Sequence, residues 1–142
     1  HTDRRDIAAD DFFKGLYETA LKPGELIVSV SFPTPQRAAY VKYKQPASRF
    51  ALIGVFVAQT AGGVRVAVTG GAGSVFRCKP LEDGLAKSFT PEAAKAVKVS
   101  ADGLNADLHG SAAYRAAMIS VMASRAATSM SGTAPRKPPD PW

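Results

Sequence analysis

The stretch AAYVKYKQPASRFALIGVFVAQTAGGVRVAVT, residues 38–69, decides the fold. Side-chain character alternates through Ala38–Lys44, and two further strand-like runs follow at Ala51–Thr60 and Val64–Thr69. The pair Gly62-Gly63 supplies the backbone freedom for a tight hairpin between the last two runs. Because short links join the successive strands, the sheet is predicted to be antiparallel.

The residues before this stretch predict one more helix and one more strand. A short helix is predicted over Asp11–Leu21, because Phe12, Leu16 and Ala20 recur at the spacing of one buried face. The run Glu25–Phe32 alternates strictly and predicts a strand with one strongly apolar face.

From residue 80 the apolar period changes from two to about 3.6, which indicates helices. Pro80–Lys87 and Pro91–Val97 each begin with proline at a first helical position, and Thr90 is a good cap for the second. Ser111 is predicted to cap the last and longest helix, which runs to about Thr128. Strands followed by helices predict an α+β fold, an antiparallel sheet of three to four strands covered on one face by about three helices.

The composition excludes several classes of protein. The 142 residues suffice for one domain with its own core, and no run of 18 apolar residues marks membrane insertion. The net charge of +6 is scattered along the chain without interleaved aromatics, so nucleic acid is not an expected partner. The single Cys78 cannot form an internal disulfide, an iron–sulfur cluster or a structural zinc site within this chain, which fits a reducing cytoplasm.

The sequence contains no self-contained active site. The glycine cluster at Gly70, Ala72 and Gly73 matches neither GxGxxG nor GxxxxGK[ST], so a strand-end turn is favoured over a nucleotide loop. No catalytic residue and no metal ligand set is predicted. Lys42 and Lys44 share one side of their strand and leave two interpretations: a solvated strand face, or a lysine at a strand end facing an anion bound elsewhere.

Four blocks in a fixed order carry a family resemblance. They are IAADDFFKGLYETALKPGELIVSVSFP (7–33), YVKYKQPASRFALIGV (40–55), VRVAVTGGAGSVFRCKPLE (64–82) and LHGSAAYRAAMISVMASRAA (108–127). Together they resemble the C-terminal domain of the FAD-containing medium subunit of molybdenum hydroxylases, the carbon monoxide dehydrogenase and xanthine dehydrogenase type. The resemblance covers nearly the whole chain up to about residue 128.

The resemblance implies a domain organisation and a set of partners. Residues 1–10 would be the tail end of a missing FAD-binding domain and residues 11–128 the α+β C-terminal domain. The Pro-rich residues 129–142 are expected to form a flexible tail. FAD would be held mainly by the absent N-terminal domain. Molybdopterin would lie in a large partner subunit and [2Fe-2S] clusters in a small one, in the cytoplasm, and electrons would pass from the clusters to FAD.

The resemblance also implies three cofactor-binding residues. Lys44 lies where the family pattern Y-x-K-x-K places a base near the flavin, Ile27 matches an apolar position against the isoalloxazine ring, and Tyr40 is a further candidate on the strand of Lys44. A cation near the N1 and C2 carbonyl region would stabilise reduced, anionic flavin. Several relatives have a Gly-acidic pair in the next loop, where this chain has Ser48-Arg49. That departure leaves the electron acceptor open.

Two functions of different classes follow. The first is a domain that closes over a flavin and docks partner subunits, without catalysis of its own. The second is a stand-alone basic interaction domain without catalytic activity. A small independent enzyme is a weaker third, because the chain offers no candidate nucleophile or metal set.

Overall fold

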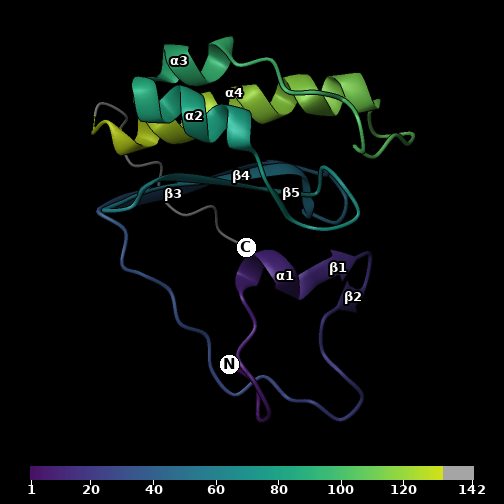
Figure 1. Ribbon diagram of the computed structural model, residues 1–142. Helices are drawn as coiled ribbons and strands as arrows, with labels where there is room; N and C mark the ends of the chain where they lie inside the picture. Colours follow the sequence, from purple (N-terminus) through teal and green to yellow (C-terminus); the bar gives the residue numbers. More distant parts are fainter. Residues whose placement is uncertain (133–142) are drawn as a thin grey trace.

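Helices cover one face of a four-stranded antiparallel sheet, and the N-terminal residues lie on its other side (Figure 1). The computed structural model describes residues 1–132. The strands run in the order β3 (Arg37–Lys44), β4 (Ala51–Thr60), β5 (Gly63–Thr69) and β6 (Phe76–Arg77). The covering helices are α2 (Lys79–Lys87), α3 (Pro91–Ala96) and α4 (Ala112–Met130). The predicted α+β fold is therefore confirmed.

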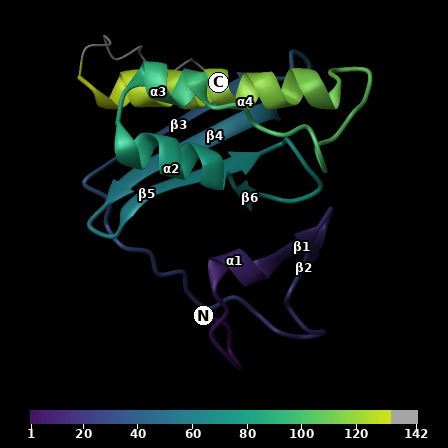
Figure 2. The ribbon, with the colours of Figure 1, turned by 45° about the horizontal axis from the view of Figure 1, so that its top comes forward.

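The core lies between the sheet and the helices. On β4 the side chains of Ile53, Val55 and Val57 are fully buried, because their face of the strand meets α4. The helices contribute Leu81, Leu85, Ile119 and Met122 to the same core. Each such side chain contributes about 1.5–3 kcal/mol on burial. Among residues 1–132, α2, α3 and α4 lie on one side of the sheet (Figure 2), and the other side, which we call the open face, carries no such helix layer.

Two helices, α3 and α4, begin directly after their predicted capping residues. The Thr90 hydroxyl accepts a hydrogen bond from the Ala93 backbone N–H, and the Ser111 hydroxyl accepts one from that of Tyr114, both at 3.2 Å. The longest helix runs on to Met130, past the expected end near Thr128. The rest of the predicted flexible tail, from residue 133, lies outside the described residues. Within the described part of the chain, no helix is long and apolar enough to cross a bilayer.

Residues 1–36, which we call the arm, differ most from the sequence prediction. The predicted helix over residues 11–21 is wrong: α1 (Ala9–Phe12) is followed by a hairpin of β1 (Phe13–Gly15) and β2 (Glu18–Thr19). Gly15 costs a helix about 1 kcal/mol relative to alanine, and an isolated helix of this length is marginal. Packing does not compensate, because Leu16 on the predicted buried face is 71% exposed.

The predicted strand over residues 25–32 is also wrong. Ile27 forms only an isolated bridge with Thr2, and no other strand of residues 1–132 pairs with this segment. The side chains of its predicted apolar face are 68–78% exposed, namely Leu26, Val28, Val30 and Phe32. Alternation indicates a strand only where a neighbouring strand supplies hydrogen bonds. The fourth place in the sheet is taken by β6, which the sequence prediction missed.

Glu25 is the centre of the arm's hydrogen-bond network. Its buried carboxylate accepts hydrogen bonds from Arg5 Nε at 2.9 Å, Thr2 Oγ1 at 2.8 Å and the Lys22 backbone N–H at 2.8 Å. The Arg5 guanidinium, followed by the Lys22 N–H and the Thr2 hydroxyl, lowers the pKa of Glu25 to about 2.

This lowered pKa predicts when the network breaks. Because the folded pKa lies below the ordinary 4.5, the carboxylate stabilises the arm fully above that pH and stops doing so as the pH falls through about 2. The Lys22 amide proton, followed by NMR, should therefore titrate with a midpoint near pH 2. A Glu25→Gln variant, which cannot ionise, serves as the control and should show no such step. A midpoint near 4.5 would contradict the proposed pairing.

Candidate functional site

The open face of the sheet is aromatic and basic. Directly paired residues share a face, so the register places two rows there: Tyr40, Phe56, Ala67 and Arg77, and beside them Lys42, Gly54 and Thr69. Tyr40 is 47% exposed and Phe56 40%. The arm lies on this side of the sheet in both views (Figures 1 and 2). An ion pair of 3.2 Å joins Arg77 Nη1 to Asp10 Oδ2 on the arm.

Tyr40, Gly54 and Thr69 form an arrangement that we call the Tyr40 seat. The Tyr40 hydroxyl hydrogen-bonds to Thr69 Oγ1 at 2.9 Å. To reach β5, the phenol crosses β4 over Gly54, where a Cβ would collide with Tyr40 Oη and with Thr69 Oγ1. Only glycine at this position leaves room for the phenol. The ring is thus anchored at its tip on the sheet, with nearly half of the residue exposed.

The sequence prediction missed Gly54 and Thr69. A signal was available for Gly54, because a glycine inside an apolar strand often marks the close approach of another group. Thr69 carried no such signal, since its partner stands on a different strand, 29 residues earlier in the chain.

Lys44 lies at the end of β3, half-buried, beside a bulge. Tyr43 pairs with Ile53 and Lys44 pairs with Ala51, so the extra residue is Leu52 on β4. Because nothing is inserted into β3, side-chain alternation continues and Lys44 stays on the side of Lys42. Lys42 Nζ donates to the Arg49 carbonyl at 3.1 Å and so fixes the adjoining loop, residues 45–50.

Ile27, the third predicted contact, lies on the arm and not on the sheet. It is 52% exposed and borders a cavity of about 300 Å³ whose lining residues all belong to the first 31 residues, among them Phe12, Phe13 and Val30. The structure therefore brings Lys44 and Tyr40 onto one strand and leaves Ile27 on a separate segment. The flavin contacts of all three residues stay predictions.

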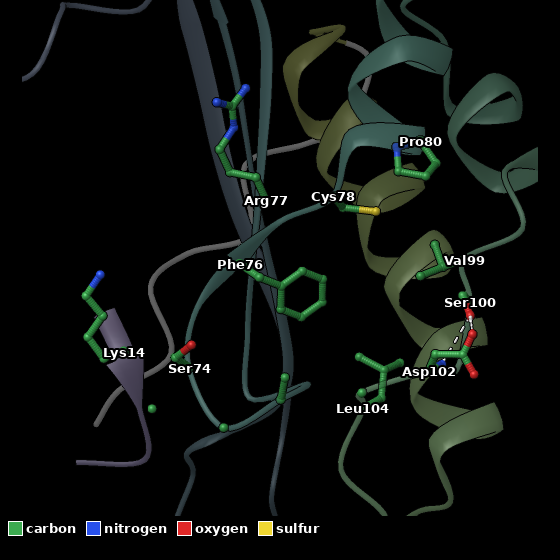
Figure 3. Close-up of a pocket in the computed structure, with 14 residues that line it drawn as sticks. Lys14, Ser74, Phe76, Arg77, Cys78, Pro80, Val99, Ser100, Asp102 and Leu104 are labelled. Carbon is green, nitrogen blue, oxygen red and sulfur yellow. Dashed lines mark hydrogen bonds between the residues drawn. The ribbon is translucent and has the colours of Figure 1, made fainter. Parts of the chain in front are cut away.

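The glycine cluster borders a larger cavity, of about 470 Å³, between the sheet end, the arm and residues 99–104 (Figure 3). The Phe76 ring points into it, and the Ser100 hydroxyl on its rim donates to Asp102 at 2.7 Å. Gly70, with φ at +74°, turns the chain out of β5, and the next helix begins only at Lys79. The cluster is thus the strand-end turn that the sequence favoured, and not the start of a phosphate-binding helix.

Two ionisable groups beside this cavity are engaged in the fold. Glu82 accepts hydrogen bonds from Arg77 Nη2 at 2.7 Å and from the Val66 backbone N–H at 3.0 Å. The second bond gives a partner to a β5 amide that the short β6 does not reach. Burial opposes ionisation of Glu82, but these bonds and one from Lys79 outweigh it and lower its pKa. Burial raises the pKa of the Cys78 thiol, so it is not a reactive thiolate.

Comparison with known proteins finds relatives that are medium subunits or chains of oxidoreductases. No family model matches the chain. It is 35% identical over 126 residues to the nicotine 6-hydroxylase medium subunit of Paenarthrobacter nicotinovorans, covering 82% of this chain and 44% of that protein. It is 33% identical to the carbon monoxide dehydrogenase medium chain of Hydrogenophaga pseudoflava, covering 87% and 47% respectively. The chain thus spans somewhat less than half the length of these relatives.

Solved structures agree in fold. Quinoline 2-oxidoreductase from Pseudomonas putida 86 matches with a TM-score of 0.70 at 24% identity, over 90% of this chain and 48% of that one, which supports the fold alone. The Cu,Mo-CO dehydrogenase matches with a TM-score of 0.64 at 26% identity, over 92% and 50%. By sequence and by fold together, the chain belongs to the medium-subunit family of molybdenum hydroxylases of the carbon monoxide dehydrogenase type.

Proposed function

We propose that this chain is the C-terminal part of an FAD-containing medium subunit and closes over a flavin held mainly by the preceding domain. The Tyr40 seat carries this proposal. An aromatic ring that is anchored at its tip and exposed on an open sheet face suits contact with a planar ring system. Lys44, on the same strand and the same side, adds a positive charge that favours an anionic partner.

The residues present fit one side of a flavin and not its phosphates. Tyr40 offers a ring contact and Lys44 a charge, while the turn at residues 70–73 is committed to the fold, because the Gly70 carbonyl accepts a hydrogen bond from Arg115. FAD bound here would supply the electron transfer. This chain's own residues would orient the ring system, exclude water from one side and tune its charge.

The arm suggests where the preceding domain ends. We propose that the whole arm, and not only residues 1–10, continues that domain, with the boundary near residue 36. Its apolar segment from Leu26 to Phe32 is exposed, so a sheet in the absent half would complete the strand that the alternation predicts. The ion pair between Asp10 and Arg77 holds the arm to the sheet only locally.

The partners and cofactors belong to the same proposal. A large subunit with molybdopterin and a small subunit with [2Fe-2S] clusters would deliver electrons to the flavin, in the cytoplasm. The loop at residues 45–50 would border the flavin next to Lys44, and it presents Phe50 at 77% exposure and Arg49 with φ at +60°.

Removing the Lys44 charge tests the proposal. In the full-length FAD-loaded subunit, Lys44→Ala should lower the two-electron potential of the flavin by about 30 mV, equivalent to about 1.4 kcal/mol. The physical reason is that the reduced, anionic flavin loses a positive charge at the end of the strand that carries Tyr40. The measurement is a spectroscopic redox titration.

Lys95→Ala is the matched control. Lys95 is an exposed lysine on α3, in the helix layer on the other side of the sheet, so its removal changes the net charge equally. Its variant should keep the wild-type potential. An unchanged potential in Lys44→Ala, or an equal shift in both variants, would remove Lys44 from the flavin site.

A further inference from the structure

Arg115 is a buried cation that joins three segments of the chain. The residue is 2% exposed on α4, and its Nη1 donates to the Leu52 carbonyl at 2.8 Å and to the Gly70 carbonyl at 3.1 Å. Its Nη2 donates to both carboxylate oxygens of Asp107, at 2.9 and 2.8 Å. Its Nε is the only buried side-chain nitrogen or oxygen atom of residues 1–132 that has no hydrogen-bond partner. The two outer nitrogens of the guanidinium therefore donate two hydrogen bonds each.

The two carbonyls need this arginine because the sheet leaves them without a partner strand. Leu52 is the extra residue of the bulge and has no partner in either strand register. Gly70 follows the last pair of β5, and its positive φ turns the chain away from β4. A buried carbonyl left unsatisfied is costly, so Arg115 stands in for the missing ladder bonds.

These carbonyls flank the Tyr40 seat. The last pair between β4 and β5 joins Gly54 to Thr69, the two residues under and at the tip of the phenol. Gly70 comes directly after Thr69, and Leu52 comes two residues before Gly54. The guanidinium thus joins β4 to β5 immediately beyond the pair Gly54–Thr69, on which the Tyr40 phenol rests.

We infer that Arg115 is a positioning residue for the flavin contact: it sets the spacing of β4 and β5 that lets the Tyr40 hydroxyl reach Thr69 across Gly54. Asp107 orients the guanidinium and is itself fixed by the His109 backbone N–H at 2.9 Å. The inference rests on the proposed function, because it assumes that Tyr40 contacts the flavin.

The test is flavin fluorescence in the full-length FAD-loaded subunit. An electron-rich phenol in contact with a flavin quenches its emission, so wild-type fluorescence should be low. Arg115→Lys keeps the charge and loses the fork, and we expect emission to rise about threefold or more as Tyr40 leaves its seat. Asp107→Asn, which weakens the hold on the guanidinium, should change it in the same direction by about twofold.

Two further variants make the result decisive. Ile119→Ala opens a core cavity on the same helix without touching the seat, so it should lower the melting temperature while emission stays quenched. Tyr40→Leu should raise emission by itself; if it does not, the proposed flavin contact fails and the inference with it. Quenched emission in Arg115→Lys beside bright Tyr40→Leu overturns the positioning role alone. Should Arg115→Lys fail to fold, Asp107→Asn decides the question in its place: raised emission supports the positioning role, and quenched emission overturns it.

Discussion

Gly54→Ala should displace the Tyr40 phenol and raise flavin emission severalfold in the FAD-loaded subunit, while the free energy of unfolding falls by only about 1–2 kcal/mol. The new Cβ would collide with Tyr40 Oη and Cζ and with Thr69 Oγ1, which all belong to side chains that can move to another rotamer. The fold then loses little more than the hydrogen bond between them. A single methyl group would thus alter the candidate site far more than the stability.

The measurement combines emission with urea unfolding. Gly62→Ala is the matched control, because the Cβ added there meets nothing closer than Thr60 Oγ1 at 3.8 Å. That variant should resemble the wild type in both assays. If Gly54→Ala leaves the emission quenched, either the phenol does not lie over Gly54 or Tyr40 does not contact the flavin, and Tyr40→Leu distinguishes these two.

Gly70→Ala should lower the free energy of unfolding by about 3 kcal/mol or more. Position 70 has φ at +74°, which disfavours any side chain, and a Cβ there would collide with the Ala51 carbonyl oxygen and come within 3.0 Å of that of Leu52. Those atoms belong to the backbone and cannot rotate away. The collision would also push apart the segments that Arg115 holds together.

Gly103→Ala separates the cost of a side chain at positive φ from the cost of the collision with the β4 backbone. Gly103 has the same φ of +74°, but a Cβ there meets nothing within 4 Å. Its replacement should therefore cost only the backbone term, about 1 kcal/mol. The difference between the two variants in urea unfolding measures the collision at Gly70. Equal losses would mean that β4 yields there, and that the sheet end is less rigid than the contacts of Arg115 indicate.

The fold was predictable wherever local pattern and long-range partner agree. The three longest strands, β3, β4 and β5, are joined by short links, and Thr90 and Ser111 cap their helices, so sequence and structure coincide there. The arm was mispredicted because its periodicity is real but its packing partner is missing from the described chain: Leu16 finds no surface to cover. The two-residue β6 was missed because it is too short to show any periodicity.

The candidate site was predictable only in part. The family resemblance named Tyr40 and Lys44, but what holds Tyr40 in place depends on residues distant in sequence. Arg115 reads as one polar position on a helix, and its role depends on a bulge at Leu52 and a turn at Gly70 that only the sheet register reveals. Local periodicity carries no information on such cross-chain contacts.

The exposed segment from Leu26 to Phe32 matters while the protein is being synthesised, because it can aggregate. It combines alternating aliphatic residues, no charge and no internal proline, the composition of segments that stack into amyloid-like fibres. On the proposed arrangement, the sheet that accepts this run leaves the ribosome first, and the newly made segment docks onto it during synthesis. The order of translation would then act as the safeguard, and chaperones would be needed most when that earlier half is slow to mature.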